Sequence, residues 1–282
     1  MIHFNITIRK ENFPIFNVIF FMVKRLILLD KIYNTDSRKD RLNYKSRYNK
    51  YLNELVKGFP KTRIEIRQIR DIDNRIEIFI EGPEEKFVKN IIFSEIGTVI
   101  PFDQLKEKDI LKGTMINVGD VGFGIFLDCG IIRQRTDILL PLHILRDQLA
   151  DGKKVSVRDI INAYDFIDNF PIYSKIIEVD KEEVNIQGEI AQKTLDIFNK
   201  IISENIEGLF MCGETKGQFK KALIKTGHLH DIVSIERFGF LENLVLFKQD
   251  TNARGIISEI GKYLEGCKFS VLIPNRMRKL KR

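Results

Sequence analysis

A hydrophobic run punctuated by glycines, INVGDVGFGIFLDCG at residues 116–130, sets the strongest limit on how this chain can fold. Glycines that cradle a phosphate lie between a strand and the N-terminus of a helix. Here Gly119, Gly122 and Gly124 match neither GxGxxG nor GxxxxGK[ST], and the next residues, IFLDCG, continue as a strand. The glycines therefore predict bends and close backbone approaches in a small barrel, rather than a nucleotide-binding loop.

Short strand-like segments surround this run and predict an all-β region over residues 103–190. The run and the residues before it supply two strands, and TDILLPLHIL supplies a third. The segments KKVSVRDII and YSKIIEVDKEEVNIQGE supply the rest. Five short strands with glycines at the bends favour a small barrel of OB type.

The regions on either side of the barrel both read as βαββαβ. In residues 22–102, strand-like KRLILLDKIY, TRIEIRQIRD, NRIEIFIEG and TVIPF alternate with two helical segments. Residues 191–275 begin with a helix and then repeat the order, from EGLFMCG to KFSVLIP. This order is the split βαβ, or ferredoxin-like, plan. The sequence thus predicts a multidomain α+β protein, in which an OB-like barrel is flanked by two ferredoxin-like domains.

Both ends of the chain differ from the rest. The first residues are apolar from Phe13 onward, but Lys24 and Arg25 interrupt the run before the ~20 residues that a membrane span needs. We expect native translation to start at Met22, so that residues 1–21 are a non-native or disordered extension and no membrane is involved. Residues 276–282 carry five cations and no acid, which predicts a basic tail.

Composition sets further limits. The formal net charge is +7 and the pI is about 9.1, which fits a polyanionic partner without demanding one. The three cysteines lie far apart without a CxxC pair, which favours reduced, buried thiols in a cytoplasmic protein.

No motif indicates catalysis or a bound metal. The nearest approach to a metal site is HLHD at residues 228–231, where the i, i+2 histidines share a face only in a strand. Carboxylate pairs elsewhere resemble helix caps or solvated faces. We therefore expect no enzyme, no cofactor and no metal.

One part of the barrel region matches a known domain. The segment KEKDILKGTMINVGDVGFGIFLDCG resembles the opening of an S1-type RNA-binding domain, which is an OB-fold barrel, and DILLPLHIL and DGKKVSVRDI resemble its third and fourth strands. The whole chain also resembles a conserved archaeal family that contains such a domain and has no assigned activity. The matching positions are Gly113, Met115, Val118, Gly122, Ile125 and Leu127.

The resemblance implies RNA binding, but the stacking positions differ. Val121 and Gly124 stand where S1 domains carry base-stacking aromatics, and Phe123 and Phe126 are displaced from those positions. The two residues are three positions apart, an odd number, so a continuous strand would place their rings on opposite faces. Each ring is therefore either a stacking platform or a packed side chain.

Several cations complete the predicted RNA-binding set. Arg133 and Arg135 lie in a barrel loop, a common ligand-binding position in OB folds. A basic segment, residues 38–61, leads to a strand whose polar face carries more cations, although a solvated surface is the alternative for scattered lysines. The predicted RNA-binding residues are Phe123, Phe126, Arg133, Arg135, Arg63, Arg67, Arg276, Arg278 and Lys279.

These features favour a non-catalytic RNA-binding protein of translation, the ribosome or RNA processing. Ribosomal RNA and tRNA are candidate ligands, and no DNA specificity is expected. One alternative is a protein-interaction or scaffold module that uses the barrel and the flanking sheets. The remaining alternative is an enzyme acting on RNA or nucleotides, with its site at a domain junction.

Overall fold

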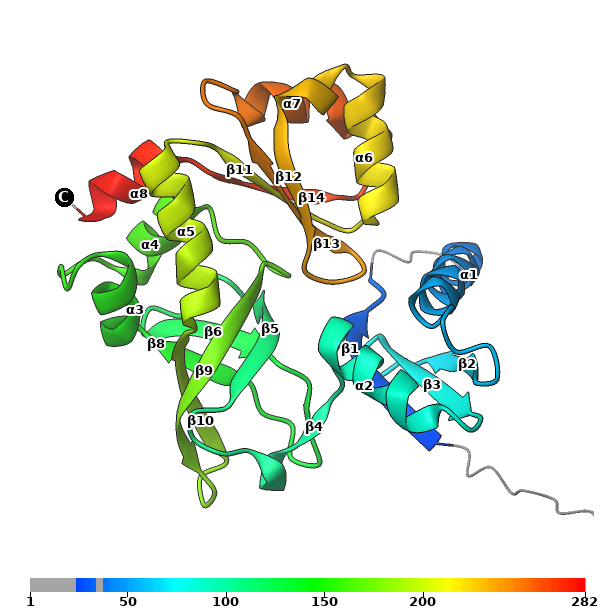
Figure 1. The fold of residues 1–282 in the computed structure, drawn as a ribbon. Coiled ribbons are helices and arrows are strands. Elements are labelled where there is room, and N and C mark those ends of the chain that lie inside the picture. Colours follow the sequence, from blue (N-terminus) through cyan, green and yellow to red (C-terminus); the bar gives the residue numbers. More distant parts are fainter. Residues whose placement is uncertain (1–23, 34–37, 282) are drawn as a thin grey trace, which may run out of the picture.

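The structure, a computed structural model, describes residues 24–33 and 38–281. It contains an N-terminal α/β domain, a closed five-stranded barrel and a C-terminal α/β domain (Figure 1). The architecture is thus mixed α+β with a barrel and several sheets, which confirms the predicted fold class at this level. The predicted extension, residues 1–21, lies outside the described residues.

The N-terminal domain is a three-stranded antiparallel sheet with two helices on one face. Its strand order is β1-β3-β2, and Ile66, Ile78 and Ile80 turn toward the helices to form the core. Alternation in RIEIRQI follows from this one-sided burial, because every second residue faces solvent. The elements are β1 (Lys24–Lys31), α1 (Arg38–Leu55), β2 (Arg63–Ile69), β3 (Arg75–Glu81) and α2 (Glu85–Glu95).

The predicted fourth strand of this domain, TVIPF, is not a full strand of the sheet. Thr98 forms a single antiparallel bridge with Leu28. The chain then leaves, and β4 (Ile100–Pro101) pairs in parallel with β7 (Ile131–Ile132) beside the barrel. Pro101 lacks an N–H donor and suits such a short edge pairing. The ferredoxin-like assignment of the two flanking domains stays a prediction.

The barrel closes in the order β10-β8-β6-β5-β9. Neighbouring strands are antiparallel except β8 and β10, which are parallel. A short 3₁₀ turn, η1 (Phe102–Gln104), precedes it. The strands are β5 (Ile110–Ile116), β6 (Gly124–Asp128), β8 (Ile138–Pro141), β9 (Pro171–Asp180) and β10 (Asn185–Ile190).

The glycines of the central run serve the barrel wall, as predicted. A Cβ atom on Gly124 would lie 2.4 Å from the Leu140 carbonyl oxygen of the adjacent strand, so only glycine allows the two backbones to approach this closely. Gly119 has φ +95° in the turn after β5, a conformation that costs other residues energy.

One predicted strand is a helix. The segment KKVSVRDII forms α4 (Val157–Tyr164), which follows α3 (Leu142–Leu149) between β8 and β9. A capping box starts α4: the Ser156 hydroxyl accepts a hydrogen bond from Asp159 N, and Ser156 N donates to the Asp159 carboxylate at 2.8 Å. This local signal outweighs the β-branched residues that favoured a strand.

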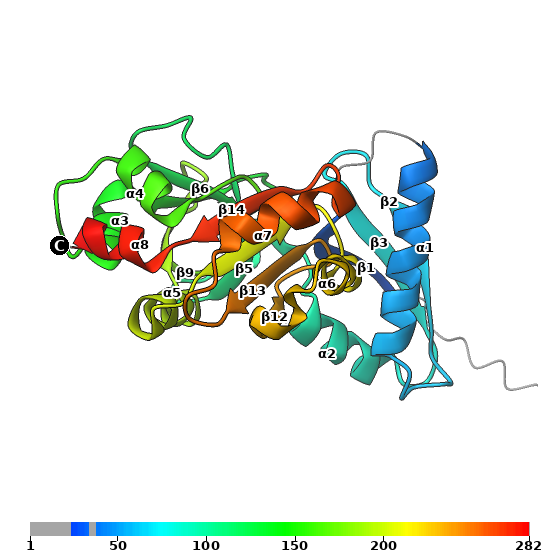
Figure 2. The ribbon, with the colours of Figure 1, turned by 90° about the horizontal axis from the view of Figure 1, so that it is seen from above.

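The C-terminal domain carries a four-stranded antiparallel sheet in the order β12-β13-β11-β14. β13 (Glu242–Phe247) is buried at every position. Val245 and Phe247 pack under α6 and α7, which lie over the sheet in Figure 2. Leu244 and Leu246 join the core of the barrel on the opposite face. The other elements are α5 (Gln192–Glu204), β11 (Gly208–Cys212), α6 (Lys216–Lys225), η2 (His228–Asp231), β12 (Ile232–Arg237), α7 (Ala253–Ile260), η3 (Gly261–Tyr263), β14 (Lys268–Leu272) and α8 (Pro274–Lys281).

The tip of the β12–β13 hairpin joins all three domains. Phe238 packs in the shared core of the barrel and the C-terminal sheet. Phe240 and Leu241 enter the core of the N-terminal domain, where the Phe240 ring centroid lies 4.6 Å from that of Tyr48. The hairpin reaches down between the other domains in Figure 1. Within residues 24–33 and 38–281, no helix has both the length and the apolar character that crossing a membrane requires.

Candidate functional site

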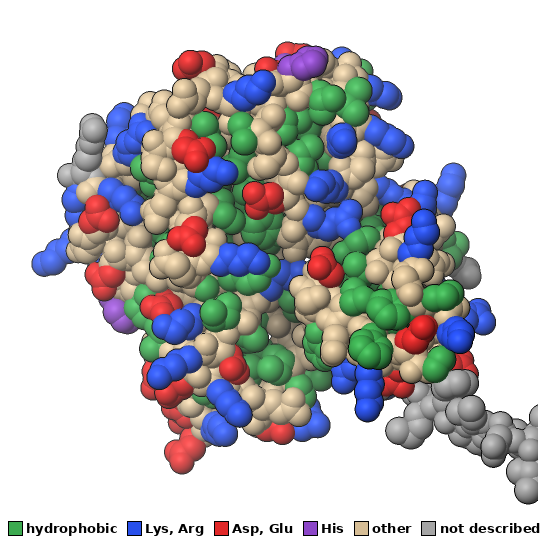
Figure 3. All heavy atoms as spheres, in the orientation of Figure 1, with side chains coloured by type: hydrophobic (Ala, Val, Ile, Leu, Met, Phe, Trp, Pro, Cys, Tyr) green, Lys and Arg blue, Asp and Glu red, His purple; other side chains and the backbone are tan. Residues whose placement is uncertain are grey.

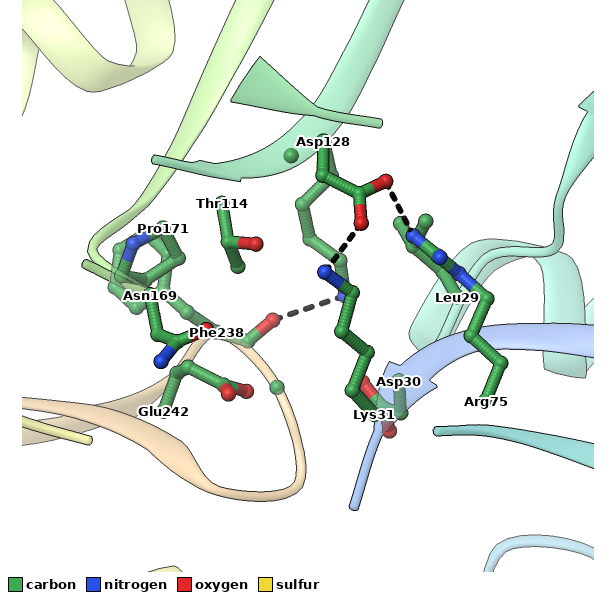
Figure 4. Close-up of a pocket in the computed structure, with 13 residues that line it drawn as sticks. Leu29, Asp30, Lys31, Arg75, Thr114, Asp128, Asn169, Pro171, Phe238 and Glu242 are labelled. Atoms are coloured by element: carbon green, nitrogen blue, oxygen red, sulfur yellow. Dashed lines mark hydrogen bonds and ion pairs between the residues drawn. The ribbon is translucent and has the colours of Figure 1, made fainter. Parts of the chain in front are cut away.

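Charged side chains meet where β1, the barrel and the hairpin tip come together (Figure 4). Asp128, at the end of β6, pairs with Lys31 of β1 and with Arg75 of β3, whose Nη2 lies 2.7 Å from its carboxylate. Arg75 is only 4% exposed. Burial alone would raise the pKa of Asp128, but Arg75 and Lys31 hold that pKa well below its usual range. The three residues thus form an ionic link between the barrel and the N-terminal domain.

Two buried carboxylates lie on the other side of this junction. The Tyr33 hydroxyl donates to Glu242 Oε1 at 2.5 Å, and the Tyr48 hydroxyl donates to Asp30 Oδ2 at 2.9 Å. Both acids abut Gly239, where a Cβ atom would meet Glu242 Oε2 and lie 3.3 Å from Asp30 Oδ1. Burial, followed by the charge of Asp30, raises the pKa of Glu242 to about 7. Glu242 therefore exchanges a proton near neutral pH.

The space enclosed by these residues is small. Its volume is about 20 Å³, which is room for about one water molecule. The Thr114 hydroxyl, which has no hydrogen-bond partner among the described atoms, points into it in Figure 4. Lys112 crosses the space and donates to the Phe238 carbonyl oxygen at 2.9 Å. Three acids ring the site, but a substrate-sized molecule has no room between them in this conformation.

A larger hollow of about 410 Å³ adjoins this junction on the barrel side. It shares Lys31, Arg75 and Asp128 with the small cavity and extends to Ile116 and Arg135. Ile116 pairs with Phe126 across β5 and β6, so the hollow leads onto the outer face of the barrel.

Phe123 and Phe126 form an aromatic pair on that outer face. Their ring centroids are 6.0 Å apart, edge to face, which shows that the prediction of opposite faces was wrong. Strand alternation does not apply because Phe123 precedes the first residue of β6. Phe123 is 56% exposed, whereas Phe126 is half-buried and lies opposite Leu139 of β8. The exposed ring offers an apolar surface that its neighbour holds in place.

The two loop arginines have different surroundings. Arg133 forms a bidentate pair with Asp103, with both Nη1–oxygen distances at 2.9 Å, and stays exposed. Arg135 donates to the carbonyl oxygen of Ile72 in the β2–β3 turn at 3.2 Å and lines the 410 Å³ hollow. Only Arg135 therefore lies beside the junction, without an ion-pair partner among the described residues.

The two predicted strand arginines differ: Arg63 is exposed to solvent, and Arg67 belongs to a structural ion pair. Arg63 is exposed and lies 3.9 Å from Glu65. Arg67 donates to the fully buried Glu77 at 2.9 Å, and Arg25 approaches the same carboxylate at 2.5 Å. Because Glu77 needs these cations, Arg67 has less freedom to leave for a phosphate than the sequence indicated.

The predicted tail residues lie on a helix. α8 packs against α3, α4 and α5, and Figure 2 shows it beside α3 and α4. Met277 is fully buried and anchors it. Arg278 donates to the Ile202 carbonyl oxygen and to Asn205 at the end of α5, while Lys279 is exposed and Arg276 is half-buried. The segment therefore packs against the folded chain as a helix and is not the free basic tail that the sequence predicted.

The cysteines and histidines do not assemble into a metal centre in the part of the chain that the structure describes. Cys129 and Cys212 are buried free thiols and Cys267 is half-buried. His228 Nδ1 lies 2.9 Å from Asp231, and its Nε2 lies 3.3 Å from Glu259. The imidazole is held between two carboxylates, in a 3₁₀ turn and not in the strand that a shared histidine face would need.

Sequence reasoning missed the junction residues. Asp30, Asp128 and Glu242 each stand in an otherwise apolar strand segment, in LILLD, IFLDC and LENLVL. A carboxylate in a buried strand requires a partner, and that was the available signal. The partners come from other domains, so no spacing along the chain reveals them.

Comparison with solved structures finds only distant similarity. An uncharacterised protein, MJ1198 from Methanocaldococcus jannaschii, is 12% identical with a TM-score of 0.22, covering 32% of this chain and 96% of that one. The a/eIF2alpha–aDim2p–rRNA complex from Pyrococcus horikoshii OT3 contains a chain that is 12% identical with a TM-score of 0.24, covering 63% and 93%. The intact alpha subunit of aIF2 from Pyrococcus abyssi is 10% identical with a TM-score of 0.22, covering 60% and 97%. TM-scores this low do not bear on function.

Comparison with family models is more informative. No curated protein matches the chain. The model of the DUF2110 central domain matches residues 105–202, which hold the barrel and α5. The model of the DUF2110 C-terminal domain matches residues 207–272, which hold the four-stranded sheet. Together the two matches span more than half of the chain, and it therefore belongs to the DUF2110 family.

Proposed function

We propose that this protein binds single-stranded RNA on the outer face of its barrel, without catalysing a reaction. The barrel order, the parallel β8–β10 pairing and the helices between the third and fourth strands support an OB-type fold. OB folds bind oligonucleotides on the face of their second and third strands, which are β6 and β8 here. The observation that carries the proposal is the exposed Phe123 ring, held edge-on by Phe126 of β6.

The charge around this face fits a backbone contact that is independent of sequence. Arg135 lines the adjoining 410 Å³ hollow and has no ion-pair partner among the described residues, so a strand that stacks on Phe123 can place a phosphate there. Lys31 also lines the hollow but is paired with Asp128, and Asp73 and Asp137 line it as well. Translation or RNA processing is the setting that we propose for this activity. For the full chain we expect affinity for a fluorescent single-stranded RNA to fall with a slope of about −0.7 per phosphate contact in log K against log salt. No binding at low salt refutes the proposal.

Phe123→Ala is expected to weaken RNA binding by about 5- to 150-fold, since stacking on one aromatic is worth about 1–3 kcal/mol per base. The ring is mostly exposed, so its removal should leave the thermal unfolding midpoint nearly unchanged. Fluorescence anisotropy at constant salt measures the effect. Phe87→Ala removes a similarly exposed ring from α2 and is the matched control. Equal affinities for both variants and the wild type would rule out Phe123 as a stacking platform.

A second candidate function is protein interaction, favoured by an apolar surface on α2. Phe87 and Phe93 are exposed, and Phe93 borders a groove of about 450 Å³ that also exposes Ile110 of the barrel. Large exposed side chains beside a groove are typical of protein contacts. A second copy of the chain is the simplest occupant to test. Sedimentation equilibrium should then show self-association that Phe87→Ser with Phe93→Ser abolishes, whereas a monomer at all concentrations excludes this occupant.

A further inference from the structure

A second hollow lies on the opposite side of the hairpin tip from the barrel. Its volume is about 380 Å³, and α1, α6 and the β12–β13 hairpin enclose it. Tyr51 comes from α1, Lys216 begins α6, and Arg237 ends β12. We name this region the seam. None of its cations belongs to the RNA-binding set that the sequence predicted.

Three cations crowd together in the seam. Lys216 Nζ donates to the Ile235 carbonyl oxygen at 2.6 Å, and the Arg237 guanidinium lies 4.4 Å from the centroid of the Tyr51 ring. Lys220 stands one turn further along α6, on the face of Lys216. None of the three forms an ion pair with a described carboxylate. Burial, and then the charges of Arg237 and Lys220, lower the pKa of Lys216.

Three acids lie near these cations without forming an ion pair with them. Asp30 lines the hollow, and its carboxylate keeps its charge while it accepts the Tyr48 hydroxyl. Glu95 lies exposed at the rim, and the charge of Glu236 acts on Lys216 in the opposite sense to the charges of Arg237 and Lys220. Figure 3 shows Lys and Arg side chains gathered over α6 and toward α1 on this face. Cations that lie together without a direct ion pair keep hydrogen-bond donors available for a bound anion.

The start of α6 adds donors to the same place. No side chain accepts a capping hydrogen bond from its first turn; the Thr215 hydroxyl accepts from Arg47, and the Glu214 carboxylate accepts from Thr215 N at 2.8 Å. Gly217, in the first turn, has nothing within 4 Å of an added Cβ atom, so the backbone there is open. Free N–H groups at the positive end of a helix suit a phosphate.

We propose that the seam binds a phosphate group of an RNA strand, through Arg237, Lys220 and Lys216. This inference rests on the proposed RNA-binding function, to which it adds a contact on the C-terminal domain. The barrel face would supply base stacking and the seam would supply charge. The two contributions therefore separate in a salt titration, because stacking changes affinity and phosphate contacts change the salt slope.

The test compares Arg237→Gln with Lys220→Gln, as a double variant, against Lys225→Gln with Lys262→Gln. The control lysines both lie over the Tyr263 ring, away from the seam, and lose the same charge. In a salt series with single-stranded RNA and the full chain, the seam variant should lower the slope by about 1.4, or about 0.7 per contact. The control should leave the slope unchanged. Equal changes in both variants would overturn the inference.

A second probe separates this inference from the proposed function. Tripolyphosphate should raise the thermal unfolding midpoint of the wild type, and the seam variant should lose that shift while the control keeps it. If the chain binds no RNA but tripolyphosphate gives this pattern, the RNA function fails and the seam is a site for small phosphates. If tripolyphosphate gives no shift, or the same shift in both variants, the phosphate site is refuted.

Discussion

Asp128→Asn is expected to lower the free energy of unfolding by about 3–5 kcal/mol, the usual cost of removing one partner from a buried ion pair. Asp128 is the anion that Arg75 and Lys31 share, and Arg75 is almost wholly buried. Asparagine keeps the shape but loses the charge, which leaves the buried Arg75 guanidinium with only the more distant Asp73 carboxylate, 4.0 Å from its Nη1. This link holds the barrel to the N-terminal sheet, so its loss should make the unfolding of the two domains less cooperative.

Urea denaturation measures the effect of Asp128→Asn, with Asp120→Asn as the control because Asp120 is an exposed acid on the same barrel. The pKa of Asp128 is depressed, so its stabilisation is present above the ordinary carboxyl pKa near 4 and is lost as pH falls below it. The difference between wild type and variant should therefore shrink toward pH 2. A loss under about 1 kcal/mol at pH 7 would contradict the ionic link.

Glu242→Gln is expected to remove a pH-dependent loss of about 3 kcal/mol from the free energy of unfolding. The folded pKa of Glu242 is about 7, against an ordinary value of 4.5. Between those values the folded chain keeps a proton that the unfolded chain releases, so stability falls as pH rises through this window. Glutamine stays neutral and can still accept the Tyr33 hydroxyl. The free energy of unfolding of the variant should therefore increase relative to that of the wild type between pH 5 and pH 8.

Unfolding free energies at pH 5, 6, 7 and 8 test this expectation. Glu236→Gln, which changes an exposed glutamate on β12, is the control. Its free energy of unfolding should depend on pH in the same way as that of the wild type. Parallel curves for Glu242→Gln as well would mean that the carboxylate is ionised in the folded state throughout the range. That result would contradict the raised pKa of Glu242, which burial and then the charge of Asp30 cause.

Local sequence patterns predicted the elements better than their partners. The alternation in RIEIRQI and the glycines around residue 124 are properties of neighbouring residues, and both features occur as expected. The pairing of β4 with β7 and the helix at 157–164 were missed. The helix begins with the Ser156–Asp159 capping box, a local signal that the strand prediction did not include.

The candidate site was harder to predict than the fold, for a physical reason. Glu242, Asp30 and Asp128 lie far apart in the chain and meet only because the hairpin tip enters a junction of three domains. The sequence placed Arg67 on the polar face of a strand and Arg278 in a basic tail, but it does not show that Glu77 and the end of α5 occupy them. The seam was missed because Arg237 and Lys216 become neighbours only in the folded chain.

Ultraviolet crosslinking of the full chain to a single-stranded RNA, followed by mass spectrometry of the peptides, tests the central claim most directly. The account predicts crosslinks at Phe123 or Phe126 on the barrel, which Phe123→Ala reduces and Phe87→Ala does not. Crosslinks confined to α2 or absent at low salt would contradict RNA binding by the barrel.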